Sequence, residues 1–265
     1  MRVKVGGRAL SLSNLDKPLY PDGTTKAEVI DYYTRIAEVM LPHLRNRPVT
    51  RVRHPEGADA PGFFEKAAPP GTPRWVPLSK EGLVLCQDLA TLVWLANLAA
   101  LELHTHQWKD GRPPDRVVFD LDPGEPAGLA ECRAVALALR ERLAVDGLEA
   151  FAKTSGRKGM QVTCLAPCDA RGIAAEFAKA APKRITDRMD KKLRRGRVFI
   201  DWSQNSLHKT TVCVYSLRAG ATPTVSTPLT WDEVESGRFT AADFTLYTVP
   251  ERIERHGDLH AGLLG

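Results

Sequence analysis

"RVVFDLDPG", residues 116–124, is an apolar run that ends in two aspartates one residue apart. Successive side chains of a strand point to opposite faces, so Asp120 and Asp122 are predicted to share one face with Val118. Adjacent carboxylates repel each other, and a divalent cation removes that repulsion, because Mg²⁺ and Mn²⁺ prefer carboxylate oxygens. The alternative interpretation is a strand end at which the two aspartates cap the following turn.

A second apolar strand, "VFIDWSQN" at 198–205, also ends in a carboxylate, Asp201. Three aspartates at two strand ends are what a two-metal phosphoryl-transfer site requires. Between these strands, "KTSGRKG" at 153–159 combines two glycines with Ser155 and Lys158. Glycines let backbone amides approach an anion closely, although the same pattern also makes ordinary turns. The segment is not a Walker A motif, whose lysine follows a different glycine spacing.

Composition places the chain among ordinary globular proteins. Of its 265 residues, 43% are apolar and 26% are charged. No charge-free apolar run reaches membrane-spanning length, and the N-terminus has no signal-peptide core. We therefore expect a cytoplasmic protein without a membrane partner. The five cysteines are scattered and form no C-x-x-C pair, which argues against a disulfide framework or a zinc site.

The charge distribution favours a polyanionic partner. Net charge is +5, and the segment 183–197 holds eight basic residues against two acidic ones. A solvated helix face and a contact with a phosphate backbone explain this segment about equally well.

Helical and strand patterns alternate along the chain, which indicates an α/β or α+β fold. Helical periodicity is found at 25–41, 89–103 and 127–145. Further strands are predicted at 148–155, 160–167, 197–203 and 210–218, and the longest irregular stretch is 54–73. Capping boxes mark helix starts at Thr25/Glu28, Thr230/Glu233 and Thr240/Asp243. Because no linker interrupts the chain, we expect residues 1–265 to form a single domain with two lobes around a cleft.

Taken together, the motifs carry a family resemblance. "VVFDLDPG", "KTSGRKG", "VFIDWSQN" and "YSLRA", together with "LSNLDKPLYPDG", "TKAEVIDYY", "GFFEK" and "LELH", resemble the polymerase domain of bacterial ligase D. That domain is a primase-polymerase of the archaeo-eukaryotic primase superfamily, used in non-homologous end joining. The resemblance covers nearly the whole chain, and its motifs are specific in combination and order. It implies a primase-polymerase fold, with mixed sheets and flanking helices in two lobes around a catalytic cleft.

The resemblance also implies roles for single residues. The catalytic, metal-binding carboxylates would be Asp120, Asp122 and Asp201, holding two Mn²⁺ or Mg²⁺ ions. The residues that bind the nucleotide would be Phe63, Phe64, His104, Ser155, Lys158, Arg194, Gln204 and Arg218, with the two phenylalanines stacking on a base. A pocket for the 5′-phosphate of DNA would consist of Asn14, Lys17 and Lys26.

The implied activity is that of a template-dependent nucleotidyltransferase that fills gaps or extends DNA ends in double-strand break or gap repair. It would use NTPs in preference to dNTPs, on DNA with gaps, overhangs or 5′-phosphate ends. A DNA ligase and the end-binding protein Ku would be partners, and the bacterial nucleoid would be the location. The chain has no K-x-D-G lysine nucleophile for nick sealing, so it is either a stand-alone polymerase or one domain of a larger protein.

One position departs from the superfamily pattern. The second motif usually ends in histidine six residues after its serine, and here that residue is Gln161. Glutamine donates a hydrogen bond but carries no charge, which argues against inferring tight nucleotide binding or primer-independent initiation from the resemblance.

Three other functions compete with gap filling: a primase that makes RNA primers, a haloacid-dehalogenase-like phosphatase, and a non-catalytic module that binds DNA ends. The phosphatase motif normally continues to Thr or Val two residues after its second aspartate, whereas Pro123-Gly124 follows here. The intact trio of aspartates argues against the non-catalytic module.

Overall fold

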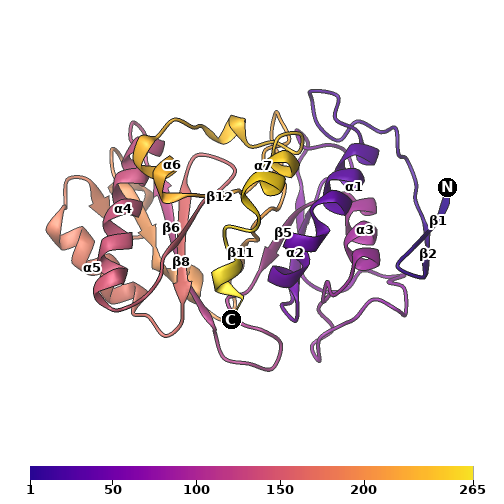
Figure 1. Cartoon of the computed structure of the whole chain (residues 1–265), viewed down its shortest axis with the longest axis horizontal. Coiled ribbons are helices and arrows are strands. Elements are labelled where there is room, and N and C mark those ends of the chain that lie inside the picture. The colour runs from indigo at the N-terminus through magenta and orange to yellow at the C-terminus, as the bar shows by residue number, and fades with distance from the viewer. Residues whose placement is uncertain (265) are drawn as a thin grey trace.

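The computed structural model describes residues 1–264, and it places two β-sheets side by side with helices on their outer sides (Figure 1). This layered arrangement confirms the mixed α/β class expected from the alternating patterns. It matters for function because the space between the two sheets holds the candidate site.

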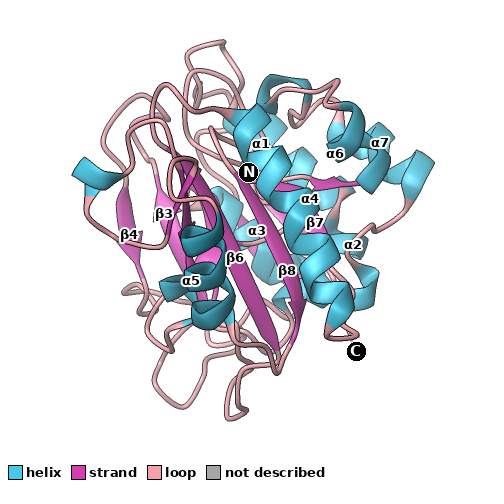
Figure 2. Ribbon diagram, turned by 90° about the vertical axis from the view of Figure 1, so that its left-hand side faces the viewer, coloured by secondary structure: helices cyan, strands magenta, loops and turns pink. Residues whose placement is uncertain are grey.

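The larger sheet is built around β6 (Arg116–Pro123). In spatial order its strands are β12 (Pro228–Leu229), β7 (Phe151–Thr154), β8 (Met160–Leu165), β6, β10 (Val198–Asp201) and β9 (Ile185–Thr186). Neighbouring strands are antiparallel except β9 and β10, which run parallel. Figure 2 shows β6 and β8 as a long central pair.

The two faces of β6 differ as its sequence predicts. Val117, Phe119 and Leu121 are buried in the hydrophobic core, which they share with α4 (Leu129–Val145). Asp120 and Asp122 point the other way and line a cavity between the sheets. The predicted period of two is therefore confirmed, and the core on one face fixes which way the carboxylates point.

The smaller sheet is antiparallel and has the strand order β11 (Thr211–Val212), β5 (Ala100–Thr105), β3 (Val49–Arg53) and β4 (Phe63–Glu65). Arg51 of β3 ties the edge strand β4 to the rest of this sheet. Its fully buried guanidinium lies 2.9 Å from Glu65 and donates to the Ala67 carbonyl at 2.6 Å. A buried charge needs such partners, so Arg51 holds β4 and the chain after it in place.

Helices cover the outer faces of both sheets (Figure 1). Beside the larger sheet lie α4 and α5 (Ala170–Ala180), and beside the smaller one lie α1 (Lys26–Arg35), α2 (Ala37–Leu44) and α3 (Leu89–Asn97). The capping box of Thr25 and Glu28 starts α1 as predicted, while Ile36 separates α1 from α2 within the expected single helix. Across residues 1–264, no helix is long and apolar enough to cross a membrane.

Short elements complete the fold. They are the hairpin β1 (Arg2–Val5) and β2 (Arg8–Ser11), the helices α6 (Trp231–Ser236) and α7 (Val249–His256), and the 3₁₀ helices η1 (Lys191–Leu193), η2 (Trp202–Asn205), η3 (Ala241–Asp243) and η4 (Ala261–Leu263). The capping boxes predicted before α6 and η3 are both present.

Three boundaries differ from the sequence-based expectation. The helix expected at 89–103 ends at Asn97, where Ala99 reverses the chain with φ of +56° and β5 begins. Every residue of β5 is buried, so the strand lacks the alternation that distinguishes it from a buried helix. The strand expected at 210–218 is only two residues long, and the irregular stretch 54–73 contains β4.

The C-terminal segment docks onto the larger sheet through His260. Its ring is buried, and Nε2 lies 3.1 Å from the Ala152 carbonyl of β7. Burial lowers the pKa of His260 to about 3 and outweighs the opposing hydrogen bond to Ala152. The folded protein therefore holds this imidazole neutral over a pH range in which the unfolded chain protonates it.

We predict that acid weakens this docking. Below about pH 6.5 His260 binds a proton in the unfolded state but stays neutral in the folded state, so the free energy of unfolding decreases as the pH falls. From pH 7.5 to pH 5 His260 alone is expected to contribute a loss of about 2 kcal/mol in the free energy of unfolding. His260→Gln should remove this contribution in urea unfolding curves and leave that of the other buried histidines, while exposed His256→Gln serves as the control. Equal pH slopes for wild type and His260→Gln would contradict the prediction.

Candidate active site

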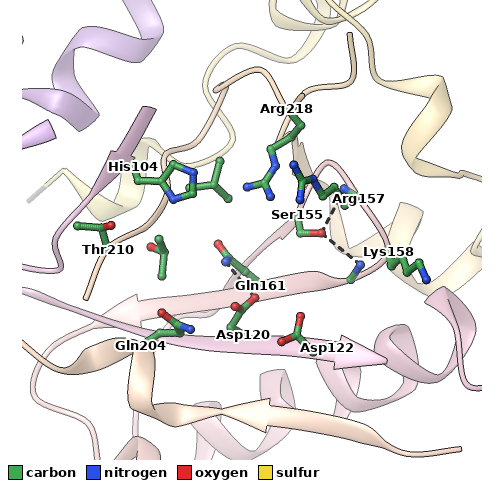
Figure 3. A pocket seen from close by; sticks show the side chains of 13 residues that line it. His104, Asp120, Asp122, Ser155, Arg157, Lys158, Gln161, Gln204, Thr210 and Arg218 are labelled. Carbon is green, nitrogen blue, oxygen red and sulfur yellow. Dashed lines mark hydrogen bonds between the residues drawn. The ribbon is translucent and has the colours of Figure 1, made fainter. Parts of the chain in front are cut away.

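A cavity of about 470 Å³ lies between the two sheets (Figure 3). The smaller sheet lines it with residues of β5 and β11, and the larger sheet lines it with residues of β6 and β8. Its lining comprises His104, Asp120, Asp122, Ser155, Arg157, Lys158, Gly159, Gln161, Gln204, Thr210, Thr211, Val212 and Arg218. Most of these side chains are polar or charged, as expected of a site for a charged ligand.

Strand register places four polar residues in one row across the larger sheet. Lys153 of β7 pairs with Gln161 of β8, Gln161 pairs with Asp120 of β6, and Asp120 pairs with Asp201 of β10. Directly paired residues of neighbouring strands project from the same face. The buried ammonium of Lys153 donates to Ser226 Oγ at 2.6 Å, and burial lowers the pKa of Lys153 to about 7.

The aspartates of β6 make this face acidic. Asp120 Oδ1 accepts a hydrogen bond from Gln161 Nε2 at 3.0 Å, and Asp122 lies 3.9 Å from the Arg194 guanidinium. Burial raises the pKa of both carboxyls; the charge of Asp122 raises that of Asp120 further, and the charge of Asp201 raises that of Asp122. The site thus disfavours its own negative charges until a cation neutralises them.

Asp201 occupies the predicted strand position but directs its carboxylate locally. It accepts hydrogen bonds from the Ser203 N–H at 3.0 Å, from the Ser203 hydroxyl, and from Gln204 Nε2 at 2.7 Å. In residues 1–264 no three His, Cys, Asp or Glu side chains are arranged to hold one metal ion together. The metal-binding trio therefore stays a prediction.

The residues present nevertheless suit a divalent cation. Asp120 and Asp122 offer hard oxygen atoms on one wall, where their mutual repulsion favours a positive ion. Gln161 Oε1, which belongs to a buried side chain at that wall, has no hydrogen-bond partner among the described residues. An orphaned buried oxygen beside two carboxylates is consistent with a site for a hard cation.

The segment 153–159 (KTSGRKG), called the glycine loop below, packs so closely against its neighbours that side chains would not fit at its two glycines. Gly156 has φ of +71°, and a Cβ there would lie 2.5 Å from Arg218 Cγ. A Cβ at Gly159 would lie 2.2 Å from the Leu121 carbonyl oxygen. Ser155 Oγ accepts the N–H groups of Arg157 at 3.3 Å and Gly159 at 3.2 Å, which shapes the loop. Lys158 reaches the cavity edge, where its ammonium lies 2.7 Å from exposed Glu125.

The structure brings His104 and Arg218 to the wall opposite the aspartates, on either side of a buried carboxylate that sequence reasoning missed, Glu102. A second missed residue is Arg157, which lines the same wall. The available signals were modest: Glu102 precedes His104 by two residues on one strand face, and Arg157 lies within the glycine loop.

Phe63 and Phe64 separate because they are neighbours on a strand. Phe64 is 69% exposed, and its ring meets His104 edge-on with 5.9 Å between centroids, beside the cavity. Phe63 lies under the Arg53 guanidinium at 5.3 Å. The structure thus links Phe64, through His104, to the cavity lining.

Arg194 and Gln204 lie beside the cavity wall that carries Asp120 and Asp122, called the acidic wall below. The Arg194 guanidinium lies over the Phe199 ring at 3.8 Å and within 3.9 Å of Asp122. Gln204 lines the cavity, and its amide is engaged by Asp201.

The predicted 5′-phosphate residues gather at a separate place. The Lys17 N–H donates to the Asn14 carbonyl at 3.2 Å, and the Lys26 N–H donates to the Lys17 carbonyl at 2.9 Å. Lys26 is 6% exposed, and burial, followed by the charges of Lys17 and Arg53, lowers its pKa. Lys17 pairs with exposed Glu56 at 3.1 Å. A nearly buried lysine beside two other cations is a site that favours an anion.

Comparison with known proteins identifies close relatives. The family model described as "LigD, primase-polymerase domain" matches residues 25–260. The multifunctional non-homologous end joining DNA repair protein LigD of Mycobacterium tuberculosis is 43% identical over 277 residues, which cover 94% of this chain and 36% of the relative. The bifunctional non-homologous end joining protein LigD of Bacillus subtilis is 33% identical and is covered to 43%. The chain therefore spans less than half the length of these relatives.

A solved structure agrees with the fold over almost the whole chain. The polymerase domain of Mycobacterium tuberculosis ligase D, in complex with DNA, matches with a TM-score of 0.90 and 39% sequence identity. The match covers 96% of this chain and 98% of that domain. The length of the present chain thus corresponds to that domain.

We predict that a divalent cation stabilises the fold through the acidic wall. At a concentration 100 times its Kd, Mn²⁺ should add about 2.7 kcal/mol to the free energy of unfolding of wild type. Asp122→Asn removes one of the two repelling charges, so the metal-free variant should be at least as stable as wild type and should lose the response to Mn²⁺. Thermal unfolding with and without Mn²⁺ measures both effects, with exposed Asp31→Asn as control. A wild-type response retained in Asp122→Asn would refute the assignment.

Proposed function

The chain belongs to the LigD primase-polymerase domain family and is a nucleotidyltransferase of the polymerase type, and we propose that it adds templated nucleotides at gaps and ends of broken DNA. Members of this family depend on a divalent metal. Because the chain spans about a third of its mycobacterial relatives, the proposal concerns this domain and not the activities of the longer proteins.

The observation that carries the proposal is the opposition of charge across the cavity. Asp120 and Asp122 line one wall, and the cations Arg157 and Arg218 line the other beside His104, whose pKa is lowered by burial (Figure 3). A nucleoside triphosphate with bound divalent cations matches this arrangement, because its phosphates suit the basic wall and its cations suit the acidic one.

We assign metal binding to Asp120, Asp122 and Asp201, with Mn²⁺ or Mg²⁺ as the ions of a two-metal site. When bound, the ions would neutralise the negative charge that develops on the reacting phosphates. The chain's own part is to hold the carboxylates: Gln161 orients Asp120 by its hydrogen bond, and Ser203 and Gln204 hold Asp201. Asp201 Oδ2 accepts only the hydrogen bond from Gln204, so it keeps a lone pair that could bind a metal ion.

The remaining cavity residues are proposed to bind the nucleotide. Lys158 and Arg218 supply donors for phosphate oxygens, whereas the Nε2 of His104 is engaged by Glu102, so His104 donates to a phosphate only as the imidazolium. The Ser155 hydroxyl accepts two backbone N–H groups and still has its own proton to donate. Additional contacts are assigned to Arg194 and Gln204 beside the acidic wall, and stacking on a base is assigned to Phe63 and Phe64.

Further proposals concern the substrate and its context. DNA with gaps, overhangs or 5′-phosphate ends is the proposed substrate, with repair by non-homologous end joining as the pathway and the nucleoid as the place of action. A DNA ligase and Ku are the proposed partners. Residues 1–265 are proposed to act as one domain, since His104 of one sheet and Asp120 of the other line the same cavity.

Single-nucleotide gap filling tests the function and its sugar preference together. Wild type with Mn²⁺ should add the complementary nucleotide and prefer ribonucleotides by roughly ten- to a hundredfold, since a polar group left unpaired by a deoxyribose costs about 1–3 kcal/mol. Asp120→Ala, Asp122→Ala and Asp201→Ala should each lower the rate at least about a hundredfold.

The Ser155→Ala variant tests whether the Ser155 hydroxyl distinguishes ribonucleotides from deoxyribonucleotides. In the gap-filling assay, untemplated addition by wild type would exclude the proposed function, and equal use of ribonucleotides and deoxyribonucleotides would exclude the sugar preference. An Asp201→Ala variant that stays active would exclude the proposed role of Asp201 in metal binding.

The cluster of Asn14, Lys17 and Lys26 leads to a prediction about the downstream end. Wild type should bind gapped DNA with a 5′-phosphate more tightly than the same DNA with a 5′-hydroxyl. The Lys17→Ala/Lys26→Ala variant should lose this preference and show a shallower salt dependence, by about one unit of slope per lost phosphate contact. The control is Lys4→Ala/Lys80→Ala, which removes two exposed lysines elsewhere. If the control behaves like the Lys17/Lys26 variant, the effect is one of net charge alone.

A further inference from the structure

A single buried carboxylate, Glu102, lies behind the basic wall of the cavity. It is 2% exposed and shares one face of β5 with His104. Its Oε2 lies 2.9 Å from His104 Nε2 and 3.6 Å from an Arg218 nitrogen. Its Oε1 accepts hydrogen bonds from Arg157 at 2.9 Å and from the Ala219 N–H at 3.0 Å. Three side chains that line the cavity therefore converge on one anion.

The charge of Glu102 is held firmly in this position. Burial alone would raise the pKa of Glu102, but the hydrogen bond from His104 and the charges of Arg218 and Arg157 lower it to about 2. The residue is therefore a carboxylate throughout the physiological range, and it stays paired because an isolated buried charge is unfavourable.

This arrangement constrains long basic side chains that would otherwise move apart. The charges of Arg157 and Arg218 act against each other, as the lowering of the Arg218 pKa by burial and, in part, by Arg157 indicates. Glu102 offsets that repulsion and restricts both guanidinium groups, each of which would have many rotamers in solution. Binding an anion then requires little further ordering of the wall.

Arg157 is the least buried of the three and keeps donors for a ligand. Its side chain is 53% exposed, and one terminal nitrogen serves both Glu102 and the Ala219 carbonyl. Its other two guanidinium nitrogens make no hydrogen bond within residues 1–264, and the residue lines the cavity beside Ser155 (Figure 3). A guanidinium anchored at one nitrogen and open at the others is suited to a phosphate oxygen.

We propose that Glu102 is a positioning residue that fixes His104, Arg157 and Arg218 toward the cavity, and that Arg157 is a further phosphate-binding residue of the nucleotide site. The inference rests on the proposed function, because it takes the ligand of the cavity to be a nucleoside triphosphate. It adds one anchor and one donor to the residues assigned above.

Glu102→Gln separates positioning from simple electrostatics. Removing a negative charge close to an anion site would by itself tighten anion binding. Loss of the anchor acts in the opposite direction, since the glutamine amide cannot accept from all three neighbours and the basic wall loses its order. Weaker binding in Glu102→Gln therefore identifies positioning as the dominant effect.

The test measures tripolyphosphate binding by calorimetry, together with KM and kcat for the ribonucleotide in gap filling. Glu102→Gln is expected to raise the tripolyphosphate Kd and the nucleotide KM about tenfold while kcat changes less than about threefold. Arg157→Gln should raise both several-fold, and exposed Arg112→Gln, which also loses one positive charge, should match wild type.

The double variant Glu102→Gln/Arg157→Gln should be no weaker than Glu102→Gln alone, because Arg157 contributes only when it is anchored. Unchanged or tighter binding in Glu102→Gln, wild-type binding in Arg157→Gln, or additive losses in the double variant would each overturn the inference. If Glu102→Gln does not fold, tripolyphosphate binding by Arg157→Gln and Arg157→Lys tests the inference. Lysine keeps the positive charge but lacks the forked donors of the guanidinium, so Arg157→Lys should regain only part of the affinity that Arg157→Gln loses. Wild type that binds tripolyphosphate yet adds no templated nucleotide would refute the proposed function instead.

Discussion

The register between β6 and its two neighbours is the constraint on which the rest of the site depends. Asp120 lies directly opposite Gln161 on one side and Asp201 on the other, so one pairing scheme assembles the acidic wall. A slip of one residue would turn Asp120 and Asp122 into the hydrophobic core and bring Phe119 and Leu121 into the cavity. Packing of those apolar residues with α4 therefore protects the chemistry on the opposite face.

The basic residues of the site pair with carboxylates of the same chain, and these carboxylates differ in how exposed they are and in how easily a ligand can replace them. Lys158 pairs with Glu125 and Lys17 pairs with Glu56, and both acids are largely exposed, so a phosphate can replace either at little expense of stability. Glu102 is buried and fully engaged. Exposed pairs thus leave lysines ready for exchange, whereas the buried pair keeps arginines and a histidine in one arrangement.

Local sequence was sufficient wherever a feature depends on residues close in the chain. Alternation along 116–122 identified the faces of β6, and the spacing of Thr25 and Glu28 identified the start of α1. Local sequence did not predict β5, because every residue of this strand is buried and the apolar alternation that distinguishes a strand from a helix is therefore absent. The family resemblance placed most of the cavity-lining residues, but it grouped Phe63 with Phe64, which strand geometry sends to different neighbours.

What the sequence by itself determined is the set of local signals: the apolar face of β6, the two adjacent aspartates, the capping boxes and the glycine loop. Only the tertiary structure decided which residues meet. Glu102 reaches Arg157 across 55 positions and Ala219 across 117, and Gln161 reaches Asp120 across 41. Periodicity and propensity are properties of neighbouring residues, but contacts over such distances exist only after two sheets have packed, so no local pattern can record them.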